Sequence, residues 1–171
     1  MLRINSNRLN VKLFFLLIIL YLYTGILAAQ PGLSPNTFKV VAIEPIQFGD
    51  FYDLGGGGTI TIDWQGIRST TGDILAIPSS VVRPALFEIA LCQGGNVTVT
   101  FEPTTTLISS KGDVLVLDVG ATEKGLNGAL FALTNNCNFK TTIRVGGTLH
   151  IPENSTAGIF TGSFEIYFKQ Q

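Results

Sequence analysis

The sequence predicts an all-β protein: a single antiparallel, immunoglobulin-like β-sandwich of about eight to ten strands that follows an N-terminal signal peptide. Apolar residues beyond position 37 alternate with polar ones at a period of two, which is typical of half-buried strands. Glycine, proline and asparagine interrupt them about every eight to twelve residues. Only 13% of the 171 residues are charged, so the polar faces of the strands consist mainly of Thr, Ser and Asn.

The charge balance and the histidine count exclude two classes of function. Eleven Lys and Arg residues against twelve Asp and Glu residues leave no positive surplus to neutralise phosphates. We therefore expect no nucleic-acid partner. The single histidine excludes a catalytic cluster of histidines.

The first 29 residues have the layout of a secretory signal peptide. A basic head precedes an apolar run from Leu13 to Leu27, and two small residues, Ala28 and Ala29, end it. We predict cleavage between Ala29 and Gln30, which leaves a short linker over 30–36 and a sandwich domain over 37–171. A retained membrane anchor is the alternative, because the apolar run approaches the length of a spanning helix. After cleavage we expect no stable membrane span.

Export decides how the two cysteines are interpreted. In an oxidising compartment, Cys92 and Cys137 are expected to form a disulfide, and their wide separation does not match a metal-ligand spacing. Two unpaired buried thiols are the alternative.

The first half of the predicted sandwich contains several short strands and their turns. Phe38 to Ile43 opens the series, and the segment Ile60–Trp64 alternates so that Trp64 is expected to face the core. Gln65 and Gly66 then turn the chain. The clearest hairpin is FEIALCQGGNVTVTF, over 87–101, in which two adjacent glycines supply the turn.

The second half ends in the most regular strand. Val114 to Val119 is predicted to be a near-continuous buried strand, 124–133 a short helix or turn, and 143–151 an alternating strand. In the closing sequence GIFTGSFEIYFKQQ, the apolar residues share one face with a glycine. The predicted strand-pairing motif consists of Gly158, Phe160, Gly162, Phe164, Ile166 and Phe168.

No residue pattern indicates an enzyme, a cofactor or a metal. The run Gly55–Gly58 lacks the Lys and the following helix of a phosphate-binding loop, so it predicts a flexible hairpin or edge loop. Asp50 and Asp53 lack the dense acidic loop of a calcium site and are expected to be solvated loop carboxylates. His150 lies on the polar side of its strand and predicts a surface histidine.

Several ordered motifs carry a resemblance to a known family. They are IQFGDF, GGGGTITID with QGIRSTTG, PALFEIAL, VGGTLHIP and AGIFTGSFEIYF. Together they resemble the bacterial secreted family called domain of unknown function 4402. The resemblance implies an exported β-sandwich in the periplasm, on the cell surface or in the medium, and it brings no assigned reaction or catalytic residues.

The last strand is also similar, more weakly, to that of chaperone-usher pilin subunits. This similarity implies strand addition between copies or with other surface subunits, and pairing with a periplasmic chaperone. The penultimate residue, Gln170, departs from the tyrosine expected there, and 30–36 is short for a donated extension unless Phe38–Ile43 is itself donated.

Two functions follow from the sequence. The first is a non-catalytic structural or interaction protein of the bacterial envelope or surface, of pilin-like type. The alternative is a secreted glycan- or ligand-binding module that uses exposed aromatic side chains such as Phe51, Tyr52 and Tyr167.

Overall fold

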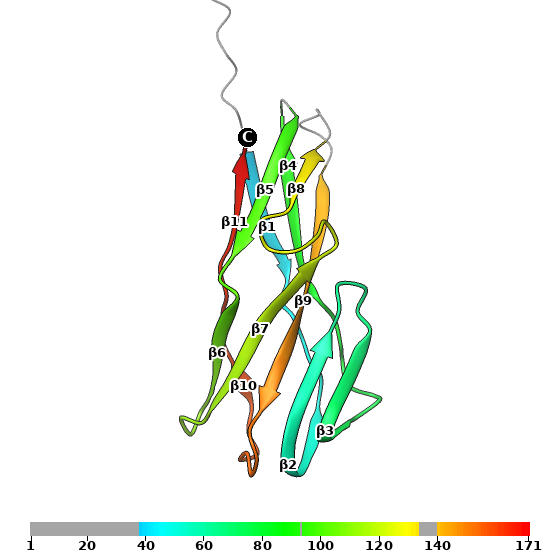
Figure 1. The fold of residues 1–171 in the computed structure, drawn as a ribbon, viewed down its shortest axis with the longest axis vertical. Helices are drawn as coiled ribbons and strands as arrows, with labels where there is room; N and C mark the ends of the chain where they lie inside the picture. The colour runs from blue at the N-terminus through cyan, green and yellow to red at the C-terminus, as the bar shows by residue number, and fades with distance from the viewer. Residues whose placement is uncertain (1–37, 93, 134–139) are drawn as a thin grey trace, which may run out of the picture. The chain divides into compact units, whose positions relative to one another are not determined.

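A computed structural model describes residues 38–92, 94–133 and 140–171, whose regular structure consists of eleven strands in two antiparallel sheets (Figure 1). The larger sheet contains eight strands: β1 (Phe38–Glu44), β2 (Phe51–Ile62), β3 (Arg68–Ala76), β4 (Ala85–Leu91), β6 (Thr104–Ser109), β7 (Val114–Thr122), β9 (Thr141–Ile151) and β10 (Phe160–Thr161). The smaller sheet contains β5 (Gly95–Phe101), β8 (Leu130–Leu133) and β11 (Ile166–Gln170). The predicted all-β sandwich is confirmed.

Strand β9 organises the larger sheet. Its first half pairs with β4 and its second half pairs with β2, while β7 pairs along the opposite side. The remaining strands extend the sheet in the order β1–β4–β9–β7–β6–β10, and the hairpin β2–β3 lies beside the second half of β9. The smaller sheet has the order β11–β5–β8.

The core consists of two clusters of buried apolar residues. One forms between the two sheets around β4, β5 and the first half of β9; its buried members are Ala85, Ile89, Leu91, Val97, Val99, Phe101, Val119, Leu133, Ile143 and Val145. The other forms beneath β2, β7 and the second half of β9; its buried members are Phe48, Ile60, Ile62, Ile74, Leu115, Leu117, Leu149 and Ile151. The half-buried side chains of Ile46 and Phe164 pack against both clusters, so they link them.

The predicted hairpin over 87–101 is wrong in its pairing. Strand β4 belongs to the larger sheet and pairs with β1 and β9, whereas β5 belongs to the smaller sheet and pairs with β8 and β11. The chain therefore passes from the larger sheet to the smaller sheet between these strands. Both strands bury alternate residues in the same core from opposite sides, and this gives the alternation that a hairpin would also show.

The glycine run is part of a strand and not the predicted loop. Gly55–Gly58 lies inside β2, where the register against β3 shifts between Asp53 and Gly58. The Asp53 carboxylate Oδ1 accepts hydrogen bonds from the backbone N–H groups of Gly55 and Gly57, at 2.9 and 3.0 Å. The positive φ angles of Gly55 (114°) and Gly57 (67°) explain why glycine suits this bulge.

Three further local predictions need correction. Trp64 lies in the turn after β2 and is 37% exposed, because the strand and its alternation end at Ile62. Within β7, Val114 and Val116 are exposed, whereas the alternate residues Leu115, Leu117 and Val119 are buried. This strand therefore has one solvent-facing side. Over 124–133, predicted to be a short helix or turn, the turn is confirmed in the first part, and the segment ends in strand β8 in place of a helix.

Candidate functional site

The carboxy-terminal segment, the site predicted for strand pairing, is split between the two sheets. Strand β10 pairs with β6 in the larger sheet, with Phe160 opposite Ser109. Strand β11 pairs with β5 in the smaller sheet, with Ile166 opposite Phe101 and Gln170 opposite Val97. The single strand that the alternation predicted is therefore two strands joined by a crossing over 162–165.

The crossing lies close against β6 because of Gly162 and the hydroxyl of Thr105. A Cβ atom at Gly162 would lie 2.4 Å from the carbonyl oxygen of Thr106, so a side chain there would push the two segments apart. The Thr105 hydroxyl donates a hydrogen bond of 2.8 Å to the carbonyl of Ser163. These contacts hold the crossing against β6. Thr105 is not among the residues predicted from the sequence, because the threonine run at 104–106 does not distinguish it from its neighbours.

The apolar residues of this segment face the core. Phe164, Ile166 and Phe168 are half-buried and pack against the first core cluster, while Phe160 packs against the second. Phe87 on β4 contacts two of them, at ring-centroid distances of 6.1 Å to Phe164 and 6.3 Å to Phe168. These contacts across the core join the carboxy-terminal segment to the opposite sheet.

The outward side of β11 is polar. The Tyr167 hydroxyl donates a hydrogen bond to the Glu165 carboxylate, and this bond raises the pKa of Tyr167 above its usual value. The final residue donates from its backbone N–H to the carbonyl of Asn96, at 2.9 Å, and from its side chain to Thr98. The end of the chain is thus bonded to β5 on one side.

The other side of the segment forms sheet edges. Among the strands that the structure describes, β10 pairs with β6 alone and β11 pairs with β5 alone. Because Gln171 donates to Asn96, alternation of the antiparallel pattern directs the N–H groups of Ile166, Phe168 and Gln170 away from β5. Strand β1 forms another edge and pairs with β4, and its side chains Val40 and Ile43 are exposed.

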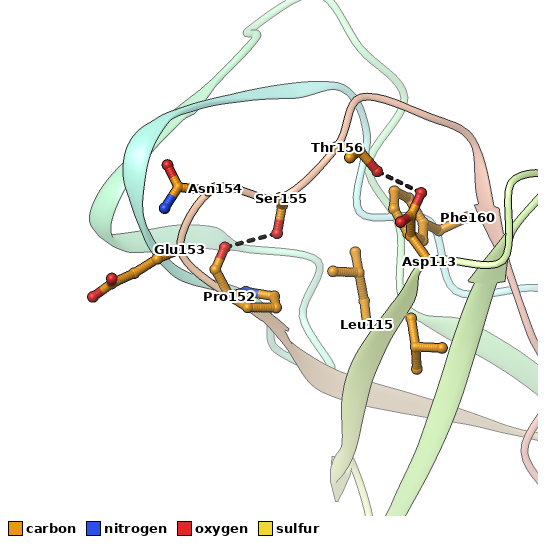
Figure 2. Close-up of a pocket in the computed structure, with 9 residues that line it drawn as sticks. Asp113, Leu115, Pro152, Glu153, Asn154, Ser155, Thr156 and Phe160 are labelled. Atoms are coloured by element: carbon orange, nitrogen blue, oxygen red, sulfur yellow. Dashed lines mark hydrogen bonds between the residues drawn. The ribbon is translucent and has the colours of Figure 1, made fainter.

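A shallow pocket of about 190 Å³ lies where the loop 152–156 meets the end of the β6–β7 hairpin (Figure 2). Asp113 lines it and accepts hydrogen bonds from the hydroxyls of Thr156 and Ser109. The bond from Thr156 is the main cause of the lowered pKa of Asp113. Within the described parts of the chain, no three His, Cys, Asp or Glu residues group as metal ligands would.

Apart from Tyr167 on β11, the other candidate residues lie away from this pocket and from the carboxy-terminal segment. His150 is exposed on β9 and its Nε2 lies 2.7 Å from Oδ2 of Asp118 on β7. Of the aromatic residues expected to be exposed, Tyr52 and Tyr167 are 63% and 54% exposed, whereas Phe51 is half-buried against the second core cluster.

Some predicted positions lie outside the described residues. These are the signal peptide and its cleavage site at Ala29 and Gln30, the linker over 30–36, and Cys137, so the disulfide to Cys92 stays a prediction. No helix among the residues that the structure describes is long and apolar enough to cross a membrane.

The two-sheet antiparallel core, with a carboxy-terminal segment that passes from one sheet to the other, places this protein among the all-β sandwich domains. The family described as "Domain of unknown function (DUF4402)" matches residues 38–169, which is most of the chain and nearly all of the sandwich. The protein belongs to this family, as its ordered motifs predicted. No curated protein and no solved structure gives a significant match.

Proposed function

We propose that this protein is an exported structural subunit of the bacterial envelope or cell surface, which assembles with further copies or other surface subunits by strand addition at its carboxy-terminal edge. The observation that carries the proposal is the arrangement of β10 and β11, each of which pairs on one side alone among the described strands. An added strand would complete such an edge through backbone hydrogen bonds. The proposal assigns no catalytic role.

The side chains of β11 suit strand addition as well as its backbone does. Ile166 and Phe168 face the core and remain partly accessible, so an incoming strand with alternating apolar residues would cover them. Strand β1 is itself an edge strand whose apolar side chains are partly exposed, and it is the segment of this chain that we propose as the donated strand. A periplasmic chaperone would use the same edge before assembly.

A denaturing gel of protein from the native envelope and medium, run unheated and boiled, tests the proposal. We expect a ladder of bands in the unheated lane that collapses on boiling. A single band in both lanes would contradict strand-exchanged assembly.

A matched pair of variants makes the test specific to the edge. Gln170→Pro removes an N–H that points away from β5, whereas Gln170→Ala removes the same side chain and keeps the N–H. We expect the Pro variant to shorten the ladder and the Ala variant to leave it unchanged. Equal ladders from both variants would exclude β11 as the pairing edge.

A second function, glycan or ligand binding, is favoured by one observation on the β2–β3 hairpin. Tyr52 lies opposite Leu75, and with Leu54 they form an apolar group in which each side chain is more than half exposed. An exposed aromatic ring is the side chain on which the apolar face of a sugar stacks. Retention on a glycan array that Tyr52→Ala abolishes, with no ladder in the gel, would favour this function.

A further inference from the structure

The outward face of the larger sheet carries an ordered array of hydroxyl and β-branched side chains. The register of four neighbouring strand pairs aligns residues from β3, β2, β9, β7 and β6 in two rows. We call this array, with the apolar pair beside it, the threonine face. The first row is Thr71, Thr59, His150, Val116 and Thr106; the second is Ser69, Thr61, Thr148, Asp118 and Thr104; the apolar pair is Ile108 and Val114.

Six of the nine polar side chains of the threonine face bond to one another in pairs across the strands. The hydroxyls of Thr59 and Thr71 are 2.7 Å apart, and those of Thr61 and Thr148 are 2.9 Å apart. The only two ionisable members of the face, Asp118 and His150, also bond to each other. These polar groups would therefore keep hydrogen-bond partners when water leaves the face, which lowers the cost of covering it.

One corner of the face is apolar and exposed. Ile108 and Val114 are cross-strand partners, 51% and 48% exposed, and Val116 next to them is 42% exposed. Three exposed β-branched side chains in one place favour contact with another surface over contact with water. No segment that the structure describes covers them.

We propose that the threonine face is a lateral contact between two copies of this chain, packed sheet against sheet. A twisted sheet is complementary to a second sheet of the same twist, and such faces pack with their strands about 30° apart. A second copy supplies that twist. The face has no Lys, Arg or aromatic residue, so its composition does not favour an anionic polymer or a stacked sugar.

The area of the face sets the strength of the contact. Five strands spaced about 4.8 Å apart, with two rows of side chains about 7 Å apart and the apolar corner, give roughly 400 Å² for each copy. The buried total of about 800 Å² is less than the roughly 1,200 Å² typical of stable complexes. We therefore expect a weak pairing, with a Kd of about 10⁻⁴ to 10⁻³ M, which many copies held in one assembly would strengthen. This strengthening by many copies in one assembly rests on the proposed function.

Nuclear magnetic resonance of the purified exported protein over a concentration series tests the inference directly. We expect concentration-dependent shifts of the amide signals in β2, β3, β6, β7 and β9. Shifts confined to β10 and β11 would overturn the face contact and favour the edge alone. The absence of any concentration dependence up to about 1 mM, roughly the weakest Kd expected, would also overturn it.

A pair of lysine variants provides the control. Val116→Lys places a like charge on both copies of the face, and we expect self-association to weaken at least about tenfold. Thr100→Lys places the same side chain on the exposed side of β5 in the smaller sheet and should leave self-association unchanged. Unchanged melting temperatures establish that both variants fold. Equal self-association of the two variants would overturn the proposal.

The two proposals fail separately. If strand addition is correct and the face contact is wrong, Val116→Lys keeps the gel ladder and the shifts do not map to the face. If the face contact is correct and strand addition is wrong, the shifts persist in Gln170→Pro and no ladder forms. Binding of a neutral polysaccharide to the face of a strictly monomeric protein would replace the second copy with that ligand.

Discussion

Replacing Phe164 with serine should destabilise the sandwich more than any other single change in the carboxy-terminal segment. Phe164 packs against both core clusters, and its ring meets that of Phe87 edge-on, at 6.1 Å and an interplanar angle of 75°. The substitution therefore removes apolar contacts from both halves of the core at once. It also leaves a hydroxyl in apolar surroundings.

The magnitude follows from two contributions. Truncating a fully buried phenylalanine costs about 3 to 5 kcal/mol, and the partial exposure of Phe164 places it at the low end of that range. Loss of the edge-to-face ring pair adds about 0.5 to 1.5 kcal/mol. We expect the free energy of unfolding to fall by about 3 kcal/mol or more, which lowers the melting temperature by about 10 °C.

Urea unfolding followed by circular dichroism measures this change, provided that the m-value stays constant. Tyr167→Ser is the matched control, because Tyr167 lies three residues further on and points outward, 54% exposed. It should cost less than about 1 kcal/mol. A Phe164→Ser protein that unfolds at the same urea concentration as the parent would refute the assignment of this side chain to the core.

Three further predictions concern separate features of the fold. Gly162→Ala should destabilise by about 1 to 3 kcal/mol because its Cβ would meet a backbone carbonyl, whereas Gly158→Ala, with its nearest neighbour at 3.4 Å, should cost much less in the same urea assay. The pKa of Asp113 is lowered in the folded protein, so its carboxylate stabilises the fold at a pH above the usual carboxyl pKa of about 3.9. This stabilisation is lost as the pH falls through the folded-state pKa. Asp113→Asn should therefore flatten the dependence of the unfolding free energy on pH below about pH 4. Cys92→Ser should make Cys137 reactive toward a thiol reagent in the exported protein, and equal reactivity in the parent would exclude the predicted disulfide.

Alternation in the sequence predicted which side chains are buried more reliably than which strands pair. The inward residues of β9 and β11 agree with the predicted faces, because a period of two follows directly from strand geometry. The pairing of β4 with β5 was predicted wrongly from equally clear alternation. A pattern that identifies the buried face of a strand carries no information about the sheet to which the strand belongs.

The sequence pattern also did not decide the local structure at the glycine run and at the end of the chain. Gly55–Gly58 is compatible with a loop or with a bulged strand, and the hydrogen bonds from Gly55 and Gly57 to Asp53 select the bulge. The closing segment reads as one strand, but it crosses between sheets at 162–165, where Gly162 allows close contact with β6. The bulge depends on backbone geometry, and the crossing depends on contacts with a strand that is distant along the chain.

The sequence by itself determined the all-β class, the faces of most strands and the family to which the chain belongs. These properties follow from short-range patterns and from ordered motifs. The tertiary structure alone decided that β10 and β11, among the described strands, each pair on one side, and it decided the alignment of the threonine face. Each depends on the register between strands far apart in the sequence, which is set by packing of the whole core and not by any local segment.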